Sequence, residues 1–170
     1  MPPKRHKRSS PKSISSDSDN FDLPPTVKPL PIIKVVGISG SGKSTLVNAL
    51  REAGYDARPV SQEHSNVPSL WQQFDRPSYL IYLYASLEIQ QARRQDVTWS
   101  DAAHEEELRR LAHAREHADV RIDTGEMTPA GIVKMVRSYL SRRKVRHADK
   151  PLEPVKATGS LKKAASDLED

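Results

Sequence analysis

The chain of 170 residues contains no cysteine. Disulfide bonds, thiol catalysis and cysteine-ligated zinc are therefore excluded, and the composition fits a reducing compartment. No apolar run approaches the roughly 20 residues that a membrane-spanning helix needs, and the first residues lack the apolar stretch of a secretory signal. We therefore expect a cytoplasmic protein whose length allows one domain of ordinary size.

Both ends of the sequence are poor in apolar residues. Residues 1–31 are basic and rich in serine and proline, and residues 142–170 are mostly polar and charged. Segments of this composition cannot bury enough apolar surface to fold alone, so we predict two disordered or flexible tails around a core of residues 32–141. If the source is eukaryotic, the basic run Lys4–Arg8 would allow a nuclear location.

The formal net charge of +5 is distributed unevenly. One basic cluster lies within the first twelve residues, and a second comprises Arg142, Arg143, Lys144 and Arg146. Such clusters can bind nucleic acid or anionic lipid. No aromatic residues are interleaved for base stacking, so the interpretation we favour is a solvated tail and a helix end stabilised by positive charge. Nucleic acid is expected to make at most non-specific contacts with the basic tails.

The strongest motif runs from Gly37 to Ser44 and has the G-x-x-x-x-G-K-S pattern of a P-loop, or Walker A motif. A β-branched apolar run at 32–36 precedes it, and a helical stretch at 46–53 follows it. This order of strand, glycine-rich loop and helix is the context that the motif requires. A glycine-rich turn with an accidental lysine and serine would not be expected to have both flanking elements.

The residue types of this loop suit the binding of a nucleoside triphosphate. The glycines allow successive N–H groups to point at phosphate oxygens, and the following helix directs its positive end at the same anion. Lys43 would supply a positive charge to the β and γ phosphates, and the Ser44 hydroxyl is the Mg²⁺ ligand of the motif. The predicted nucleotide-binding residues are Gly37, Ser39, Gly40, Ser41, Gly42, Lys43, Ser44 and Thr45.

Strands alternate with helices through the rest of the core. The apolar patterns predict strands at 32–38, 55–61, 79–84 and 120–123, and helices at 87–95, at 102–118 and after an N-cap at Thr128. Alternation of this kind is typical of an α/β fold with a parallel sheet. We therefore predict a three-layer P-loop NTPase sandwich with about four or five strands.

Three segments together resemble the small P-loop kinases, a group of nucleoside monophosphate, shikimate, gluconate and dephospho-coenzyme A kinase-like proteins. They are the P-loop, the strand at 79–84 with the helix that leads to Arg93, and the segment 118–124. The resemblance covers residues 32–141. It implies ATP and Mg²⁺ as cofactors and transfer of the γ-phosphoryl group to a small acceptor. It also implies a lid with phosphate-facing arginines, for which the candidates are Arg93, Arg94, Arg109, Arg110 and Arg115.

The sequence departs from that group between Ser61 and Tyr79. This stretch has no room for a strand that carries an acidic residue near the reacting phosphate, or for a helical acceptor-binding insertion. Glu63 is the best substitute for a Walker B carboxylate: if the strand at 55–61 lies beside the first strand, Glu63 would hold Mg²⁺ through water or accept the acceptor's proton. The alternative is an exposed carboxylate in a turn. The predicted catalytic residues are Lys43, Glu63, Arg93 and Arg115.

Three functions remain open. The first is a small ATP-dependent kinase with an unidentified small-molecule acceptor, and the second is an ATPase or regulatory module whose nucleotide state a protein partner senses. The third is a nucleotide-binding module without chemistry. No N-K-x-D guanine-reading motif is present, which disfavours a GTPase. His113 and His117 share a helix face but have no acidic partner at a metal-binding spacing, so we interpret them as surface histidines.

Overall fold

The structure is a computed structural model that describes residues 28–156. The predictions of disorder at 1–27 and at 157–170 lie outside the described residues. Among the helices of residues 28–156, none combines the length and the apolar composition that crossing a bilayer requires.

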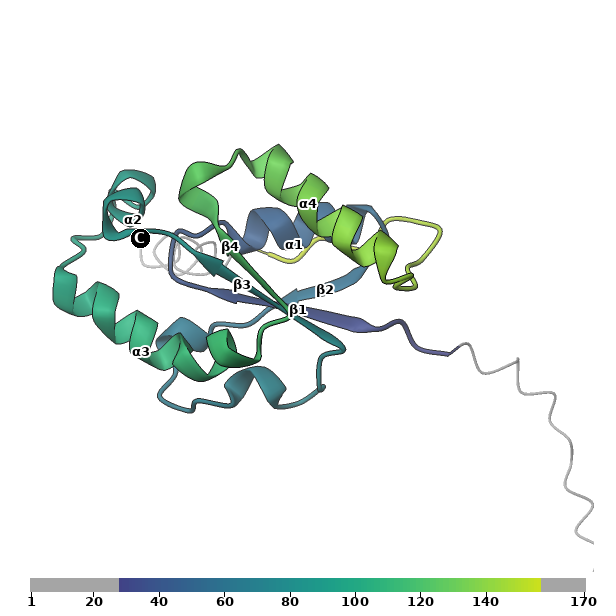
Figure 1. Cartoon of the computed structure of the whole chain (residues 1–170), viewed down its shortest axis with the longest axis horizontal. Coiled ribbons are helices and arrows are strands. Elements are labelled where there is room, and N and C mark those ends of the chain that lie inside the picture. The colour runs from purple at the N-terminus through teal and green to yellow at the C-terminus, as the bar shows by residue number, and fades with distance from the viewer. Residues whose placement is uncertain (1–27, 157–170) are drawn as a thin grey trace, which may run out of the picture.

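A parallel sheet of four strands forms the centre of the described chain, in the order β2-β1-β3-β4 (Figure 1). All three strand pairs are parallel, so every connection crosses over the sheet. The strands are β1 (Ile32–Gly37), β2 (Asp56–Pro59), β3 (Tyr79–Tyr84) and β4 (Val120–Asp123). The predicted parallel α/β sheet is confirmed, and each predicted strand is present within three residues of its expected bounds.

Helices cover both faces of this sheet (Figure 1). One face packs against α1 (Lys43–Glu52) and α4 (Pro129–Arg142), and the other packs against α3 (Asp101–His117). The short helix α2 (Leu87–Arg93) follows the carboxyl end of β3. Three short 3₁₀ turns complete the chain: η1 (Gln62–His64), η2 (Leu70–Gln72) and η3 (Thr124–Glu126). The predicted three-layer arrangement is therefore present.

Alternate side chains of the two central strands build two separate cores. Ile33 and Val35 of β1 enter the core beneath α1 and α4, whereas Val36 enters the core beneath α3. In β3, Leu83 enters the core beneath α1 and α4, and Tyr82 enters the core beneath α3. Successive side chains of a strand point to opposite faces, so a strand covered on both faces reads as one continuous apolar run.

The helix boundaries follow local capping chemistry. The hydroxyls of Ser86 and Thr128 accept the backbone N–H groups of Ile89 and Gly131, and Pro129 occupies the first turn of α4. Gly54 follows the end of α1 with φ of +93°, in the left-handed region. These three boundaries match the sequence predictions.

Residues 143–156 differ from the flexible tail that the sequence predicted to begin at 142. Val145 is buried in the core beneath α1 and α4. The N–H groups of Ala148 and Leu152 donate to the carbonyls of Gly54 and Arg51, both at 2.8 Å, and Val155 N–H donates to Asn48 Oδ1 at 2.9 Å. A few apolar side chains and these hydrogen bonds hold the segment on α1 despite its polar composition. The division of the whole chain into one domain and two tails otherwise stays a prediction.

We expect Val145→Ala to lower the free energy of unfolding by roughly 1–3 kcal/mol, because it removes methyl groups from a buried site that refills only in part. Met135→Ala, at a residue 40% exposed on α4, is the matched control and should change stability much less. Urea denaturation of both variants measures the difference. Equal, negligible effects would show that the segment after α4 does not contribute to the folded core.

Candidate functional site

The P-loop joins β1 to α1 at the carboxyl edge of the sheet. Gly40 and Gly42 have φ of +78° and +97°, values that residues with a Cβ rarely adopt, and Gly42 is the N-cap of α1. A Cβ at Gly37 would lie 2.5 Å from the carbonyl oxygen of Leu83, so this glycine is needed for close contact with β3. The glycine spacing of the motif thus follows from backbone conformation and from packing.

Lys43 turns back over the loop that precedes it. Its Nζ donates to the carbonyl oxygens of Gly37 at 2.7 Å and Ile38 at 3.1 Å. The same Nζ lies 3.1 Å from Glu63 Oε1, which forms an ion pair with it. The ammonium group is therefore held at the concave side of the P-loop by two carbonyls and one carboxylate.

Glu63 reaches this position because β2 pairs with β1. The pairing continues to Val60, whose N–H donates to Val35 O at 3.0 Å, and η1 begins two residues later. The Glu63 residue is 3% exposed, and its Oε2 has no hydrogen-bond partner among the described residues. The geometry is that of a buried carboxylate beside the P-loop and not of an exposed turn. Whether it acts in catalysis stays a prediction.

A second buried carboxylate, Glu107 of α3, contacts the other side of the P-loop. Its Oε2 accepts the Ser39 N–H at 3.0 Å, and its Oε1 accepts the Ser39 hydroxyl at 2.5 Å. Gln90 Nε2 donates to Glu107 Oε2 at 3.0 Å and to Ser39 O at 2.9 Å, and Gln90 Oε1 lies 2.6 Å from His104 Nδ1. This network links the P-loop to α2 and α3. Such a network fixes a single arrangement because every buried polar group needs its partner.

The sequence analysis missed Glu107, although a signal was present. Glu107 lies four residues before Leu111 and seven before Ala114, both of which are buried on α3. A glutamate at an inward-facing position of an amphipathic helix indicates a buried partner. Glu107 and His104 are the polar residues among those that α3 buries.

Arg93 contacts the P-loop, as its predicted role requires. Its Nη1 donates to Gly40 O at 2.9 Å and to Thr124 Oγ1 at 3.0 Å, and its Nη2 donates to Thr124 O at 2.9 Å. Arg93 thus ties the P-loop to η3, which follows β4. Next to these contacts is a cavity of about 180 Å³, lined by residues of the P-loop, α1, α2 and the start of α4, among them Gly42, Thr45, Arg93, Thr124 and Pro129.

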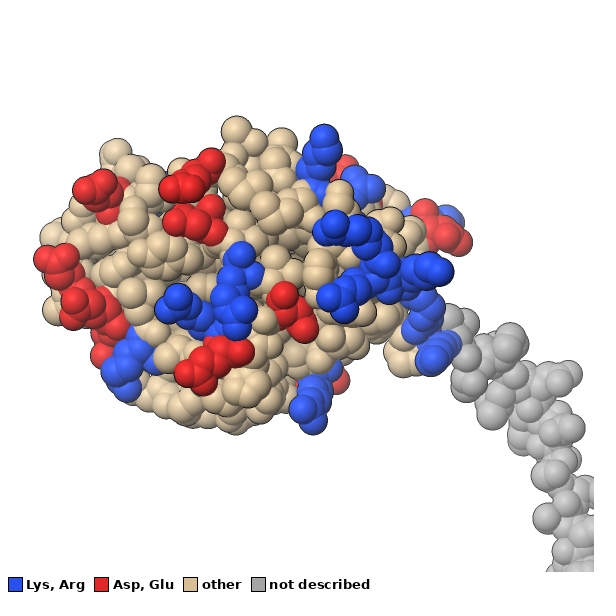
Figure 2. All heavy atoms as spheres, viewed as in Figure 1, with Lys and Arg blue, Asp and Glu red and all other residues tan. Residues whose placement is uncertain are grey.

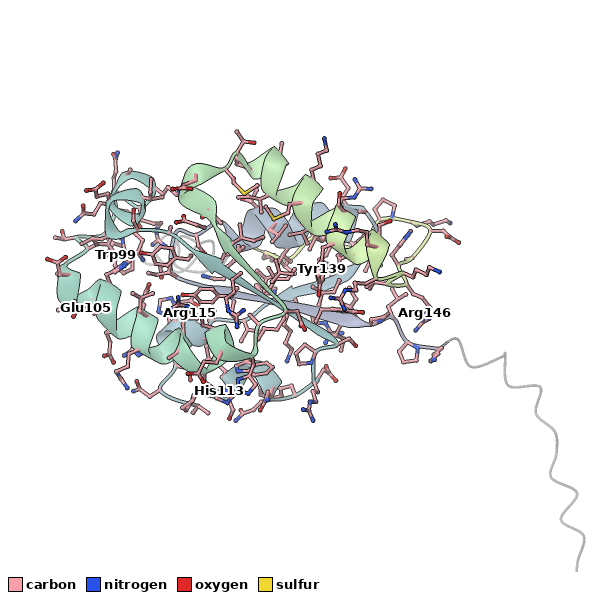
Figure 3. All side chains as sticks on the ribbon, in the orientation of Figure 1. Trp99, Glu105, His113, Arg115, Tyr139 and Arg146 are labelled. Atoms are coloured by element: carbon pink, nitrogen blue, oxygen red, sulfur yellow. The ribbon has the colours of Figure 1, made fainter. Side chains whose placement is uncertain are left out.

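Arg115 lies elsewhere. It lines a cavity of about 580 Å³ between α3 and the edge strand β4, together with Tyr82 and Tyr84 (Figure 3). Burial raises the pKa of the Tyr82 phenol, and the positive charge of Arg115 opposes that shift. The placement on this flank gives no support to a role of Arg115 at the phosphates, so its catalytic role stays a prediction.

The remaining candidate arginines are engaged with acidic or carbonyl groups. Arg94 pairs with Asp96 at 3.0 Å, and Arg109 pairs with Glu106, whose pKa is lowered by the hydrogen bond from that guanidinium. Arg110 Nη1 donates to Glu63 O at 3.3 Å. Arg110 therefore helps to hold η1 in place without facing the P-loop.

The segment between β2 and β3 is filled by structural contacts. Lys34 of β1 is buried, and its Nζ donates to Trp71 O at 3.0 Å and Gln73 O at 2.9 Å. Burial lowers the pKa of Lys34. Trp71 Nε1 donates to His113 Nδ1 at 3.0 Å. No acceptor-binding insertion is present between β2 and β3, which agrees with the short length of this segment in the sequence.

No metal-binding cluster of three or more His, Asp or Glu side chains occurs within residues 28–156. His113 and His117 stack with ring centroids 4.3 Å apart, and His113 accepts the Trp71 hydrogen bond. The sequence analysis interpreted both as surface histidines. His117 is exposed, but His113 is half-buried and therefore also contributes to packing.

No family model matches the chain. An adenylyl-sulfate kinase of Burkholderia ambifaria is 29% identical over 117 residues, which make up 69% of this chain and 52% of that protein. The chain thus spans about half the length of the curated relative it matches. Among solved structures, shikimate kinase from Acinetobacter baumannii in complex with shikimate matches with a TM-score of 0.48 and 14% identity, over 69% of this chain and 96% of that chain.

The sequence similarity and the architecture agree with the resemblance drawn from the motifs. The P-loop lies between β1 and α1 of a parallel α/β sheet, and the related sequence is that of an adenylyl-sulfate kinase. In sequence and in architecture the chain is therefore similar to small P-loop kinases.

We expect Glu107→Ala to lower the free energy of unfolding by about 1–3 kcal/mol, because it leaves the buried Ser39 N–H and hydroxyl without their acceptor. Glu105→Ala, on the exposed side of the same helix, is the matched control. It should change the free energy of unfolding by only a few tenths of that amount. Thermal or urea denaturation measures both. Equal stability of the two variants would contradict a structural role for the network.

Proposed function

We propose that the chain binds ATP with Mg²⁺ at the P-loop and transfers the γ-phosphoryl group to a small-molecule acceptor. The observation that carries the proposal is the contact of 3.1 Å between Lys43 Nζ and the buried Glu63 Oε1. This contact pairs the lysine of the Walker A motif with a buried carboxylate, which supports a role for Glu63 beside the phosphates. The relationship to an adenylyl-sulfate kinase adds support for a kinase.

The residues present fit a nucleotide. The left-handed Gly40 and Gly42 shape the loop, a Cβ at Gly42 would meet nothing within 4 Å, and the cavity of about 180 Å³ opens beside them. The buried Ser41 Oγ has no hydrogen-bond partner among the described residues. Backbone N–H groups of residues 40–45 and the amino end of α1 would bind the phosphates. Arg93 lines the same cavity and would position the bound nucleotide.

The residues also fit Mg²⁺. Ser44 and Glu63 provide the one or two protein oxygens that this ion uses when phosphates and water complete its shell. The unpartnered Glu63 Oε2 is a buried oxygen that needs a cation or a proton donor. When bound, Mg²⁺ would neutralise charge on the β and γ phosphates.

The roles of the side chains follow from charge and position. Lys43 would exchange its contacts with Gly37 O and Ile38 O for phosphate oxygens and stabilise the charge that develops during transfer. Glu63 would orient Lys43 and receive the proton of the acceptor hydroxyl, directly or through water. The acceptor oxygen forms a bond to the γ-phosphorus as the bond to the bridging oxygen of ADP breaks.

An ATPase or nucleotide-dependent regulatory module is the second candidate. It is favoured by the segment between β2 and β3, which packs on Lys34 and α3 and contributes no acceptor-binding helix. In that case the acceptor of the phosphoryl group is water, or the bound nucleotide is sensed by a protein partner.

Incubation of the protein with Mg²⁺-ATP should give ADP at a rate that a dialysable extract of small metabolites increases. Lys43→Ala should abolish the stimulated rate, since it removes the charge that contacts the phosphates, whereas Lys150→Ala, an exposed lysine, should not. The measurement is ADP formation over time. ADP formation that is equal with and without extract supports the second candidate, and no ADP under either condition contradicts the kinase.

We expect Glu63→Gln to reduce turnover by roughly 10²–10⁴-fold, the contribution typical of a positioned base. Nucleotide affinity should change much less, because the amide keeps the shape of the side chain and the P-loop is intact. Glu116→Gln, at an exposed residue of α3, is the matched control. Turnover that Glu63→Gln leaves unchanged would exclude a catalytic role for this carboxylate.

A further inference from the structure

The described chain carries a basic surface at the end of the molecule opposite the P-loop. The P-loop follows the carboxyl end of β1, whereas the segment 28–31 leads into the amino end of β1. Arg146 joins this segment to the end of α4, since its guanidinium donates to Lys28 O at 3.3 Å and Pro29 O at 2.7 Å. Figure 2 shows Lys and Arg side chains gathered at this end, on the right of the view. The exposed members are Lys28, Lys134, Arg137, Arg142, Lys144 and Arg146.

Carboxylates do not neutralise this surface. Within residues 28–156, the arginines that form ion pairs with Asp or Glu are Arg51, Arg58, Arg94, Arg109 and Arg110. No member of the basic surface forms such a pair within the described residues. Asp149 lies beside this surface, but it forms no ion pair within the described residues, and the six exposed cations outnumber it. The surface therefore maintains a positive potential that attracts an anionic partner.

The basic surface is hollowed. Two adjoining depressions of about 910 and 690 Å³ share Tyr55, Ser141 and His147. The first is lined by residues of α4 that include Lys134, Arg137 and Arg142, and the second by Lys28, Lys144 and Arg146. The two therefore form one groove with cations along both parts of it.

Aromatic groups lie in and beside this basic groove. The rings of Tyr55 and His147 have centroids 5.0 Å apart, and both residues line both depressions. The guanidinium of Arg143 lies over the Tyr139 ring at 5.1 Å (Figure 3 labels Tyr139 and Arg146). In the sequence, no aromatic residue is interleaved within the basic cluster at 142–146. In the structure, the exposed ring of His147 lies beside this cluster and packs on the buried Tyr55.

We propose that this basic groove binds the phosphate backbone of a nucleic-acid strand. A polyanion matches a surface on which several cations gather, and arginine suits phosphate because its planar guanidinium can donate two hydrogen bonds. Lys134 and Arg137 are three residues apart and so are neighbours on α4, and Arg142, at the end of the helix, lines the same depression. His147 is exposed, so its ring is a candidate face on which a base can stack, whereas Tyr55 is buried beneath it.

An anionic membrane is the less suitable partner. Peripheral membrane binding combines basic residues with apolar side chains that enter the lipid. The exposed large apolar residues of the described chain are Val67, Phe74, Val97 and Met135, and none of them lines the groove.

The proposed strand-binding site is separate from the P-loop and is testable by itself. Fluorescence anisotropy would follow the full-length protein with labelled single-stranded DNA, single-stranded RNA and a DNA duplex, each of about 20 nucleotides, over a series of salt concentrations. We expect the logarithm of the association constant K to fall linearly with the logarithm of the salt concentration. The probe that binds most tightly identifies which of the three kinds of nucleic acid the groove prefers.

The decisive comparison is between two double variants of equal net charge. Arg137→Gln with Arg142→Gln removes two cations from the groove and should weaken binding roughly tenfold or more. The slope of log K against log salt concentration should decrease in magnitude by about two. Arg76→Gln with Arg121→Gln removes two exposed cations outside the groove and should leave both values nearly unchanged. Lys134→Gln with Lys144→Gln is a second groove variant in case the first is less stable, and thermal midpoints check the folding of all three.

The same measurements can overturn the proposal. Equal loss in the groove and control variants would mean that net charge alone attracts the strand. Absence of binding at low salt, or binding to phosphatidylserine vesicles that oligonucleotides do not compete, would also exclude a nucleic-acid groove. Lys43→Ala should bind the oligonucleotides as the wild type does, so failure of the kinase proposal and failure of this one are distinguishable.

Discussion

β1 forms hydrogen bonds with a parallel strand on each side, and this pairing determines where the candidate functional side chains lie. Pairing with β2 brings η1 and its Glu63 to the P-loop, and pairing with β3 brings the carbonyl of Leu83 against Gly37. Parallel strands end at the same edge of a sheet, so residues distant in sequence meet there. A shift of β2 by one residue would turn Ala57 away from the core and move Glu63 away from Lys43.

Buried polar groups surround the P-loop on two sides. Glu63 contacts Lys43, and Glu107 contacts Ser39 through two hydrogen bonds. Burial of carboxylates is unfavourable unless each oxygen is paired. Glu107 has its partners within the protein, whereas one oxygen of Glu63 has none among the described residues. The two carboxylates therefore differ in kind: Glu107 completes the structure of the loop, and Glu63 has capacity for a further contact.

The sequence was sufficient to predict the elements that depend on local pattern. The glycine spacing from Gly37 to Gly42, the apolar run at 79–84 and the cap at Thr128 each specify their structure within a few residues. Glu63 could be placed only conditionally, because its position depends on which strand lies beside β1. Contacts between distant segments were not predictable: Glu107 with Ser39, Tyr55 with His147, and the segment 143–156 with α1.

The hydrogen bonds between Asn48 and Val155 join positions 107 residues apart. During synthesis, α1 emerges early, but its full set of contacts is complete only after the ribosome has released Val155. Contacts of such long sequence separation are slow to form because a large loop must first close. The helix that begins at Lys43 is thus synthesised well before its contacts are complete, and the nascent chain acquires its finished P-loop helix only after Val155 has left the ribosome.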